Sequence, residues 1–297
     1  MALRPVASST RPLRLLVLDV DGTVTDANHR VSEVAREAID RVSRRGVKVM
    51  LATGRRYRDT LPVAAALGID VPLVTASGAL VKRPSDHSTL ARAAFAADVL
   101  QGVVRFIAAG GHEAILYSDS FERGFDFHCR SLAGAADDPG SVGGGLQEYL
   151  GRNRALADVR PDLHEAPPPG VFAGFVMGPR ADMEALEAGL HEAFPGQLSL
   201  HTIKSPRYRD WMCEIAPAGV TKWSGVMGMA AAWGIAAEEI CAVGDDVNDL
   251  SMIRAAGLGL AMGNARPEVQ AAAAGVVGRH DGTGIADVAE LIFARLA

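Results

Sequence analysis

Two aspartates at the end of an apolar run are the first residues in this sequence whose types and spacing could support catalysis. The stretch "LLVLDVDGTVTD" (15–26) runs from aliphatic residues into Asp19 and Asp21. Residues two apart in a strand share a face, so the two carboxylates are expected to project together. Taken alone, the motif is equally compatible with an ordinary strand-ending turn at Asp21-Gly22, so other residues must decide between the two interpretations.

Three further polar groups lie at the ends of predicted elements. The stretch "ATGRR" (52–56) places the Thr53 hydroxyl and the Gly54 amide where the oxygens of an anion could be held. Lys222 lies near the start of a predicted helix, the end at which the helix macrodipole disfavours a cation. A solvated lysine is the simple explanation, whereas a nearby carboxylate or a bound anion would remove the conflict.

A dense group of acids follows a later apolar run. In "GDDVNDLSM" (244–252), Asp245 and Asp249 are four residues apart, so we expect them on one face of the helix that begins there. An N-cap aspartate explains one of these acids, but three acids and Asn248 within five residues exceed what capping requires.

The four aspartates of these motifs share a single lysine if they meet in space. Carboxylates that converge repel one another and raise their own pKa values unless a cation joins them. A hard divalent ion such as Mg2+ is the natural candidate, because no His or Cys cluster accompanies the acids. Carboxylates, a metal ion, a lysine and a hydroxyl together indicate phosphoryl transfer through an aspartyl-phosphate.

The surrounding sequence alternates short apolar runs with helical patterns, which predicts a parallel sheet with helical crossovers. The predicted strands are 13–20, 47–53, 71–76, 239–244 and 258–263, and the predicted helices are 31–46, 57–68, 220–234, 246–256, 267–274 and 284–296. The carboxyl ends of parallel strands are where open α/β sheets form ligand crevices. The candidate residues follow these strand ends, so the fold itself is expected to bring them together.

Between the two halves of this pattern lies a segment of mixed character, with helical stretches at 90–109 and 181–194 and a Gly/Pro-rich section, 134–170, expected to be partly mobile. We therefore predict an α/β fold: a Rossmann-like parallel-sheet core with an inserted α+β domain. The predicted boundaries are 1–12 for a disordered tail, 13–83 and 213–297 for the core, and 84–212 for the insert.

Composition excludes several classes of protein. A net charge of −5 gives no reason to expect binding to nucleic acid or to an anionic membrane. The three cysteines are far apart and form no CxxC pair, so neither a disulfide framework nor a zinc knuckle is expected. The first residues lack the apolar region of a signal peptide, and no apolar run reaches the ~20 residues of a spanning helix. We expect a cytoplasmic location.

Four motifs in order resemble those of the haloacid dehalogenase-like phosphohydrolases. They are "DVDGT" (19–23), "TGR" (53–55), "GVTK" (219–222) and "GDDVND" (244–249). The later "AMGNARPEV" (261–269) and "HDGTGIA" (280–286) resemble the Cof-type subfamily, whose large α/β cap (subclass IIB) has the position of the insert here. The likeness covers residues 13–83 and 213–297.

The resemblance implies a role for each matching residue. Asp19 would be the nucleophile, and Asp21 would protonate the leaving group and then activate water. The Mg2+ site would comprise Asp19, Asp21 through its backbone carbonyl, and Asp245, while Asp249 would orient Lys222 or a metal-bound water. The residues implied to bind the phosphoryl group are Thr53, Gly54, Lys222 and Asn248.

The insert would act as a cap that selects the substrate. Its stretch "HTIKSPRYRDW" (201–211) carries alternating cations, which usually mark a solvated edge strand, although one or two could face an anionic substrate. One departure from the family is Ser77, where related sequences commonly have asparagine, and this places a specificity contact in question.

The favoured function is a Mg2+-dependent phosphatase of small phosphorylated metabolites, such as sugar phosphates or phosphorylated cofactors. A phosphomutase of the same fold is one alternative, and a noncatalytic ligand-binding relative is another.

Overall fold

The computed structural model describes residues 11–135 and 144–296, which form two compact units. The core unit comprises Met1–Ala91 and Thr221–Ala297, and the inserted unit comprises Arg92–Val220. Most of the predicted tail, residues 1–10, lies outside the described residues.

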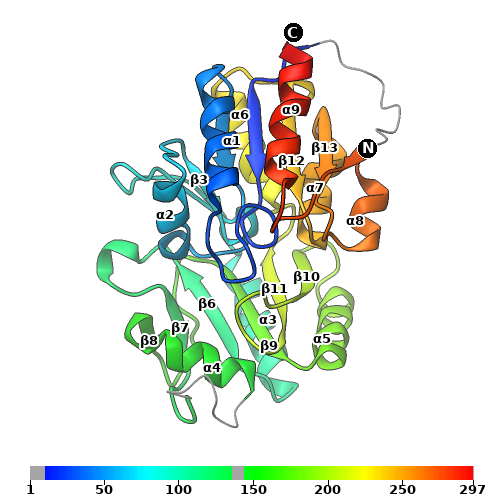
Figure 1. The fold of residues 1–297 in the computed structure, drawn as a ribbon. Helices are drawn as coiled ribbons and strands as arrows, with labels where there is room; N and C mark the ends of the chain where they lie inside the picture. Colours follow the sequence, from blue (N-terminus) through cyan, green and yellow to red (C-terminus); the bar gives the residue numbers. More distant parts are fainter. Residues whose placement is uncertain (1–10, 136–143, 297) are drawn as a thin grey trace. The chain divides into compact units, whose positions relative to one another are not determined.

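The core unit is built on a parallel five-stranded sheet, which confirms the predicted Rossmann-like class (Figure 1). The strand order is β14-β13-β12-β1-β2. The strands are β1 (Leu15–Leu18), β2 (Lys48–Leu51), β12 (Ile240–Gly244), β13 (Leu258–Ala261) and β14 (Gly275–Val276). Because β1 pairs in parallel with both β2 and β12, its carboxyl end lies between those of these two strands.

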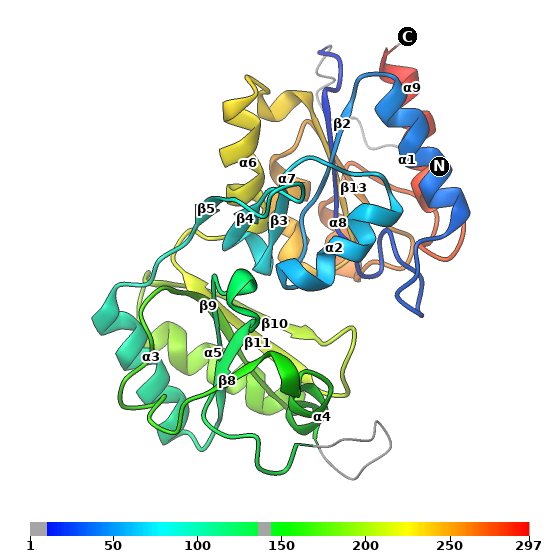
Figure 2. The same cartoon turned by 90° about the vertical axis from the view of Figure 1, so that its left-hand side faces the viewer.

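Helices cover both faces of this sheet (Figures 1 and 2). The core helices are α1 (Glu33–Arg44), α2 (Tyr57–Ala66), α6 (Lys222–Ala232), α7 (Leu250–Ala255), α8 (Pro267–Ala272) and α9 (Gly284–Leu296). Leu15 and Val17 lie two residues apart in β1 and so point to the same face of the sheet. They pack there with Val226 of α6 and Met252 of α7, which places these two helices on that face. Helices α1 and α9 lie together on the opposite face.

A small sheet of β3 (Leu73–Thr75), β4 (Leu80–Lys82) and β5 (Thr89–Arg92) corrects the first predicted boundary. Residues 84–91 were assigned to the insert, but β5 pairs with β4, so the core unit extends to Ala91. The segment 90–109 was predicted as one helix, yet it is divided between β5 and helix α3 (Ala97–Ala109).

The inserted unit has a mixed six-stranded sheet in the order β10-β11-β9-β6-β7-β8. The strands are β6 (Ala114–Ser118), β7 (Phe127–Cys129), β8 (Ala157–Val159), β9 (Val171–Gly178), β10 (Leu198–Lys204) and β11 (Trp211–Pro217). Helices α3 and α5 (Arg180–Ala193) pack one apolar core against it. Residues 213–217 were predicted to belong to the core, but they form the greater part of β11, which pairs with β9 and β10.

The other face of this sheet carries helix α4 (Gly145–Arg152), whose Tyr149 contacts the rings of Phe127 and Phe175. Both α4 and β8 lie within 134–170, so part of the section predicted as mobile loop is ordered. Propensity alone missed α4 because its stability comes from aromatic packing rather than from its glycine-rich sequence. Strand β10 lies at the edge of the sheet, where alternating cations were expected.

Among the described residues, no helix combines the length and apolar character needed to cross a bilayer. The three cysteines are buried, and none of them forms a disulfide bond.

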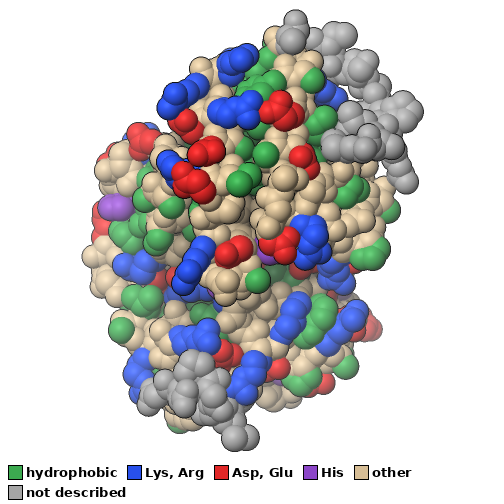
Figure 3. Space-filling model, in the orientation of Figure 1, with side chains coloured by type: hydrophobic (Ala, Val, Ile, Leu, Met, Phe, Trp, Pro, Cys, Tyr) green, Lys and Arg blue, Asp and Glu red, His purple; other side chains and the backbone are tan. Residues whose placement is uncertain are grey.

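Over α1 and α9, the face shown in Figure 3 mixes positive and negative side chains, and Arg41 pairs with Glu290 at 2.9 Å.

Candidate active site

The Lys222 ammonium joins two of the predicted aspartates. Its Nζ atom donates to Oδ1 of Asp19 and to Oδ1 of Asp249, both at 2.6 Å, and its side chain is 2% exposed. Lys222 is the first residue of α6, which Thr221 and Ser224 cap through reciprocal hydrogen bonds. The expected conflict with the helix macrodipole is therefore resolved by two buried carboxylates rather than by solvent.

Asp245 and Asp249 meet by a different route from the one predicted. They do not share the face of an α-helix, because a 3-10 helix, Val247–Asp249, precedes α7. Instead the Asp249 side chain turns back, and its Oδ2 accepts from the backbone N–H of Asp245 at 2.9 Å and of Asp246 at 3.1 Å. Carboxylate oxygens of Asp19, Asp245 and Asp249 lie within 4.8 Å of one another and could hold a metal ion.

Two glycines permit this close approach. A Cβ atom on Gly22 would lie 2.3 Å from Oδ2 of Asp245, and the φ angle of Gly22 is +75°. A Cβ atom on Gly244 would lie 2.3 Å from Cγ of Asp249. The glycines of "DGT" and "GDD" therefore leave the space that the acidic side chains occupy.

The electrostatics of the cluster favour a further cation. Burial raises the pKa of Asp19 to about 7, since the attraction of Lys222 only partly offsets desolvation and the charges of Asp249 and Asp21. Burial and the charges of Asp19 and Asp249 also raise the pKa of Asp245 well above its usual range. For Lys222, the two carboxylates outweigh burial and raise the pKa. The donor set is all oxygen and short of positive charge, which suits a hard divalent cation.

Asp21 lies in a different environment. Arg55 donates to both of its oxygens, from Nε to Oδ2 at 2.7 Å and from Nη2 to Oδ1 at 2.6 Å, and Nδ1 of His29 lies 2.9 Å from Oδ1. Burial opposes ionisation, but these hydrogen bonds and charges outweigh it and hold the pKa of Asp21 well below its usual range. The side chain of Asp21 is thus engaged by nitrogen donors, which agrees with a metal contact only through its backbone carbonyl.

The remaining predicted residues lie at the same strand ends. Ala52 donates its backbone N–H to Leu18 at 2.9 Å, which places the following Thr53 and Gly54 beside the end of β1. Thr53 is buried, and its Oγ1 accepts from the N–H of Arg55 at 3.1 Å. Asn248 is buried in the 3-10 helix between Asp245 and Asp249.

Sequence reasoning gave no role to several residues that contact the acids. Arg55 and His29 bind Asp21, while Thr23 Oγ1 donates to Oδ1 of Asp245 at 3.3 Å. Asn264 donates to the carbonyl of Gly22 at 2.8 Å and accepts from the N–H of His280 at 3.0 Å. Thr23, Arg55 and Asn264 lie within the matching motifs "DVDGT", "TGR" and "AMGNARPEV", which was their only signal, whereas His29 lies in none of the motifs.

Ser77 occupies a left-handed backbone position. Its φ angle is +54°, and its N–H donates to the carbonyl of Thr53 at 3.0 Å. Asparagine adopts this conformation more readily than serine does. Backbone geometry is therefore a physical reason for asparagine at this position, in addition to any side-chain contact.

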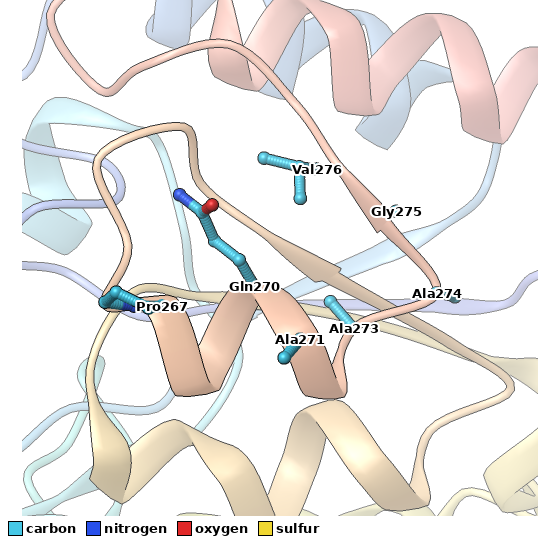
Figure 4. A pocket seen from close by; sticks show the side chains of 7 residues that line it. All are labelled: Pro267, Gln270, Ala271, Ala273, Ala274, Gly275 and Val276. Atoms are coloured by element: carbon cyan, nitrogen blue, oxygen red, sulfur yellow. The ribbon is translucent and has the colours of Figure 1, made fainter. Parts of the chain in front are cut away.

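A separate pocket beside α8 has none of the chemistry of the acidic cluster. It has a volume of about 420 Å³ and is lined by Pro267, Gln270, Ala271, Ala273, Ala274, Gly275 and Val276 (Figure 4). The amide of Gln270 donates to the carbonyls of Gly263 and Ala265. With no titratable lining residue, this pocket offers no acid, base or nucleophile.

Comparison with known proteins establishes the family. The chain matches the family model of haloacid dehalogenase-like hydrolases over residues 16–288, and it belongs to this family. It is 27% identical to Phosphatase YwpJ of Bacillus subtilis over 92% of this chain and 98% of the relative. It is 26% identical to 5-amino-6-(5-phospho-D-ribitylamino)uracil phosphatase YitU of Bacillus subtilis, with 93% and 96% covered.

A solved haloacid dehalogenase-like hydrolase from Bacteroides thetaiotaomicron has the same fold, with a TM-score of 0.75, 24% identity, and 95% of this chain and 100% of that chain covered. The predicted membership of the haloacid dehalogenase-like hydrolases is confirmed, and the curated relatives compared above are named phosphatases. Phosphatases of this superfamily generally use a divalent metal ion, and the acidic cluster provides matching ligands.

Proposed function

We propose that this protein is a Mg2+-dependent phosphatase that hydrolyses small phosphorylated metabolites through an aspartyl-phosphate on Asp19. The observation that carries the proposal is the buried Lys222 ammonium held between Asp19 and Asp249, with the Asp245 carboxylate beside them. One edge of the sheet therefore provides a nucleophilic carboxylate, a phosphate-binding cation and oxygen ligands for a metal ion.

The proposed reaction has two steps. An Asp19 oxygen bonds to phosphorus while the bond from phosphorus to the leaving oxygen breaks, and Asp21 donates a proton to that oxygen. Water then bonds to the phosphorus of the aspartyl-phosphate and loses a proton to Asp21, and the bond from phosphorus to Asp19 breaks. Asp21 is an acid in the first step, which requires it to gain a proton although Arg55 and His29 hold its pKa low in this structure, and it is a base in the second step.

We assign the other predicted residues as follows. Asp19, Asp245 and the carbonyl of Asp21 would hold the Mg2+ ion, which when bound neutralises charge on the acids and on the phosphoryl oxygens. Asp249 orients Lys222, because both of its oxygens already accept N–H hydrogen bonds. Thr53, Gly54, Lys222 and Asn248 would bind phosphoryl oxygens, and the inserted unit would select the substrate.

The test is phosphate release from sugar phosphates, nucleotides and phosphorylated cofactors, with Mg2+ or with chelator. Wild type should turn over at least one compound only with metal, and Asp19→Asn should lose at least about a thousandfold in kcat. Asp246→Asn is the matched control, because it removes a charge from the same loop, where Asp246 pairs with Arg266. Metal-independent turnover, or an active Asp19→Asn variant, would contradict the mechanism, and a need for a bisphosphate activator would indicate a mutase.

A further inference from the structure

A tightly bonded turn follows β1 and carries His29. The Oδ1 atom of Asp26 accepts from the backbone N–H of Asn28 at 2.8 Å and of Arg30 at 2.9 Å. The backbone N–H of Asp26 donates to the carbonyl of Arg30 at 2.9 Å, and the carbonyl of Asp26 accepts from the N–H of His29 at 2.9 Å. The position of His29 is therefore set by its own turn rather than by packing in the core.

The turn holds His29 in a conformation that side chains disfavour. Its φ angle is +59°, in the left-handed region, and strained residues of this kind often occur at functional sites. The consequence of this conformation is a contact, since Nδ1 of His29 lies 2.9 Å from Oδ1 of Asp21. The imidazole is about one-third exposed, whereas the Asp21 side chain is largely buried.

Arg55 binds the same carboxylate from another segment. Its guanidinium fork spans both oxygens, and its Nη1 also donates to the carbonyl of Asp59 at 3.4 Å. Arginine is only a donor, so this contact favours the carboxylate form alone. Nδ1 of His29 approaches Oδ1 from the turn, so two separate segments of the chain hold the Asp21 carboxyl group.

We propose that His29 is a positioning residue for Asp21, whose carboxyl group it fixes together with Arg55. This inference rests on the proposed function, since it concerns the same Asp21 carboxyl group. Removing the imidazole would leave Oδ1 supported by Arg55 alone, so the carboxyl group would be less firmly oriented toward the leaving oxygen. The effect should therefore be largest where the leaving group needs a proton.

The experiment compares kcat/KM for two substrates, the alkyl phosphate that is turned over best and p-nitrophenyl phosphate, whose leaving group departs as an anion. His29→Ala should lose roughly 10- to 100-fold on the alkyl ester and several-fold less on the aryl ester. His29→Asn keeps a donor and an acceptor near Nδ1 and tolerates positive φ, so it should recover most of the activity.

His87→Ala is the matched control. His87 also has a positive φ angle, +56°, and its Nδ1 lies 2.8 Å from the Tyr57 hydroxyl, but it does not contact Asp21. Equal losses on both esters, or unchanged kinetics of His29→Ala, would overturn the role of His29 and leave the proposed function standing. A wild type that releases no phosphate from either ester would overturn both.

Discussion

The core unit and the inserted unit bury polar groups in opposite ways. In the core unit, Asp19, Asp245 and Asp249 converge on one ammonium group and remain short of positive charge. In the inserted unit, the buried His128 is bonded on both sides, from Nε2 to Ser118 Oγ at 2.9 Å and from Nδ1 to Asp158 Oδ2 at 2.8 Å. The first arrangement is incomplete without a ligand, whereas the second is complete in itself.

This difference distinguishes a cluster that is suited to binding a ligand from a network that stabilises the fold. Buried groups that satisfy one another stabilise a fold and need no partner. Buried like charges repel one another and raise the free energy of the folded state. They are retained where a cation or a reacting group relieves the repulsion. Although Ser118, His128 and Asp158 have the order of a hydrolytic triad, Ser118 is buried, so we interpret them as a structural network.

The largest effect should follow from removing the ammonium of Lys222. Lys222→Met leaves two buried carboxylates without their common partner, and breaking such a pair costs about 3–5 kcal/mol of unfolding free energy. Lys204→Met is the control in the inserted unit, where Nζ donates only to the carbonyls of Tyr208 and Asp210 among the contacts described. Denaturant unfolding of both variants measures the difference, and equal losses would contradict the comparison.

Adding a methyl group at Gly22 should disturb the acids directly. The Cβ atom would overlap Asp245, so Gly22→Ala should lose about 1–3 kcal/mol in overpacking and strain, together with metal-dependent activity. Gly46→Ala is matched, because Gly46 has a φ angle of +82° and no atom within 4 Å of the added Cβ. If Gly46→Ala lost as much stability as Gly22→Ala, backbone strain rather than overlap would be the cause.

Metal binding should stabilise the core unit. At a Mg2+ concentration 100-fold above Kd, binding adds about 2.7 kcal/mol, which should raise Tm by several degrees. Thermal unfolding with Mg2+ and with chelator checks this in wild type and in Asp245→Asn, where the shift should be smaller. A shift that is as large in Asp245→Asn would mean that the ion binds elsewhere.

Disrupting the Ser118–His128–Asp158 network of the inserted unit should lower the free energy of unfolding and leave the catalytic rate nearly unchanged. His128→Ala leaves buried Ser118 without its imidazole partner and should cost about 1–3 kcal/mol. Its kcat should stay within about threefold of wild type, because His128 belongs to no proposed step. A selective loss of kcat at normal stability would instead give this network a functional role.

The smallest effects should appear in the pH dependence of stability, with opposite signs in the two units. The pKa of Asp19 is raised from 3.8 to about 7, so its contribution is complete below pH 3.8 and is lost as pH rises toward 7. Burial lowers the pKa of His128 below 6.5, so its contribution is lost as pH falls below that value.

Metal-free Asp19→Asn should therefore gain Tm over wild type as pH rises, while His128→Ala should approach wild type as pH falls. Thermal unfolding between pH 4 and pH 8 measures both differences. Parallel curves for wild type and Asp19→Asn would show that Asp19 does not titrate differently in the two states.

Local pattern was sufficient for β1, β2, β12 and β13 and for the residues at their ends. It missed the short strand β14, and the strand expected at 71–76 pairs as β3 in the small sheet. The apolar run of β1 predicted a buried strand, and the spacing of Asp19 and Asp21 predicted a shared edge. Local pattern failed for the helix expected at 90–109 and for the order within 134–170. In both places, strand pairing or aromatic contacts between distant segments override local propensity.

The sequence by itself determined the alternation of strands and helices and the acids at the strand ends, because these depend on the periodicity of neighbouring residues. The tertiary structure decided which partners those acids have. Arg55 reaches Asp21, and Lys222 reaches Asp19, only because parallel pairing brings the ends of separate segments to one edge. These contacts join residues far apart in the chain, and no local pattern specifies which of several charged side chains will meet.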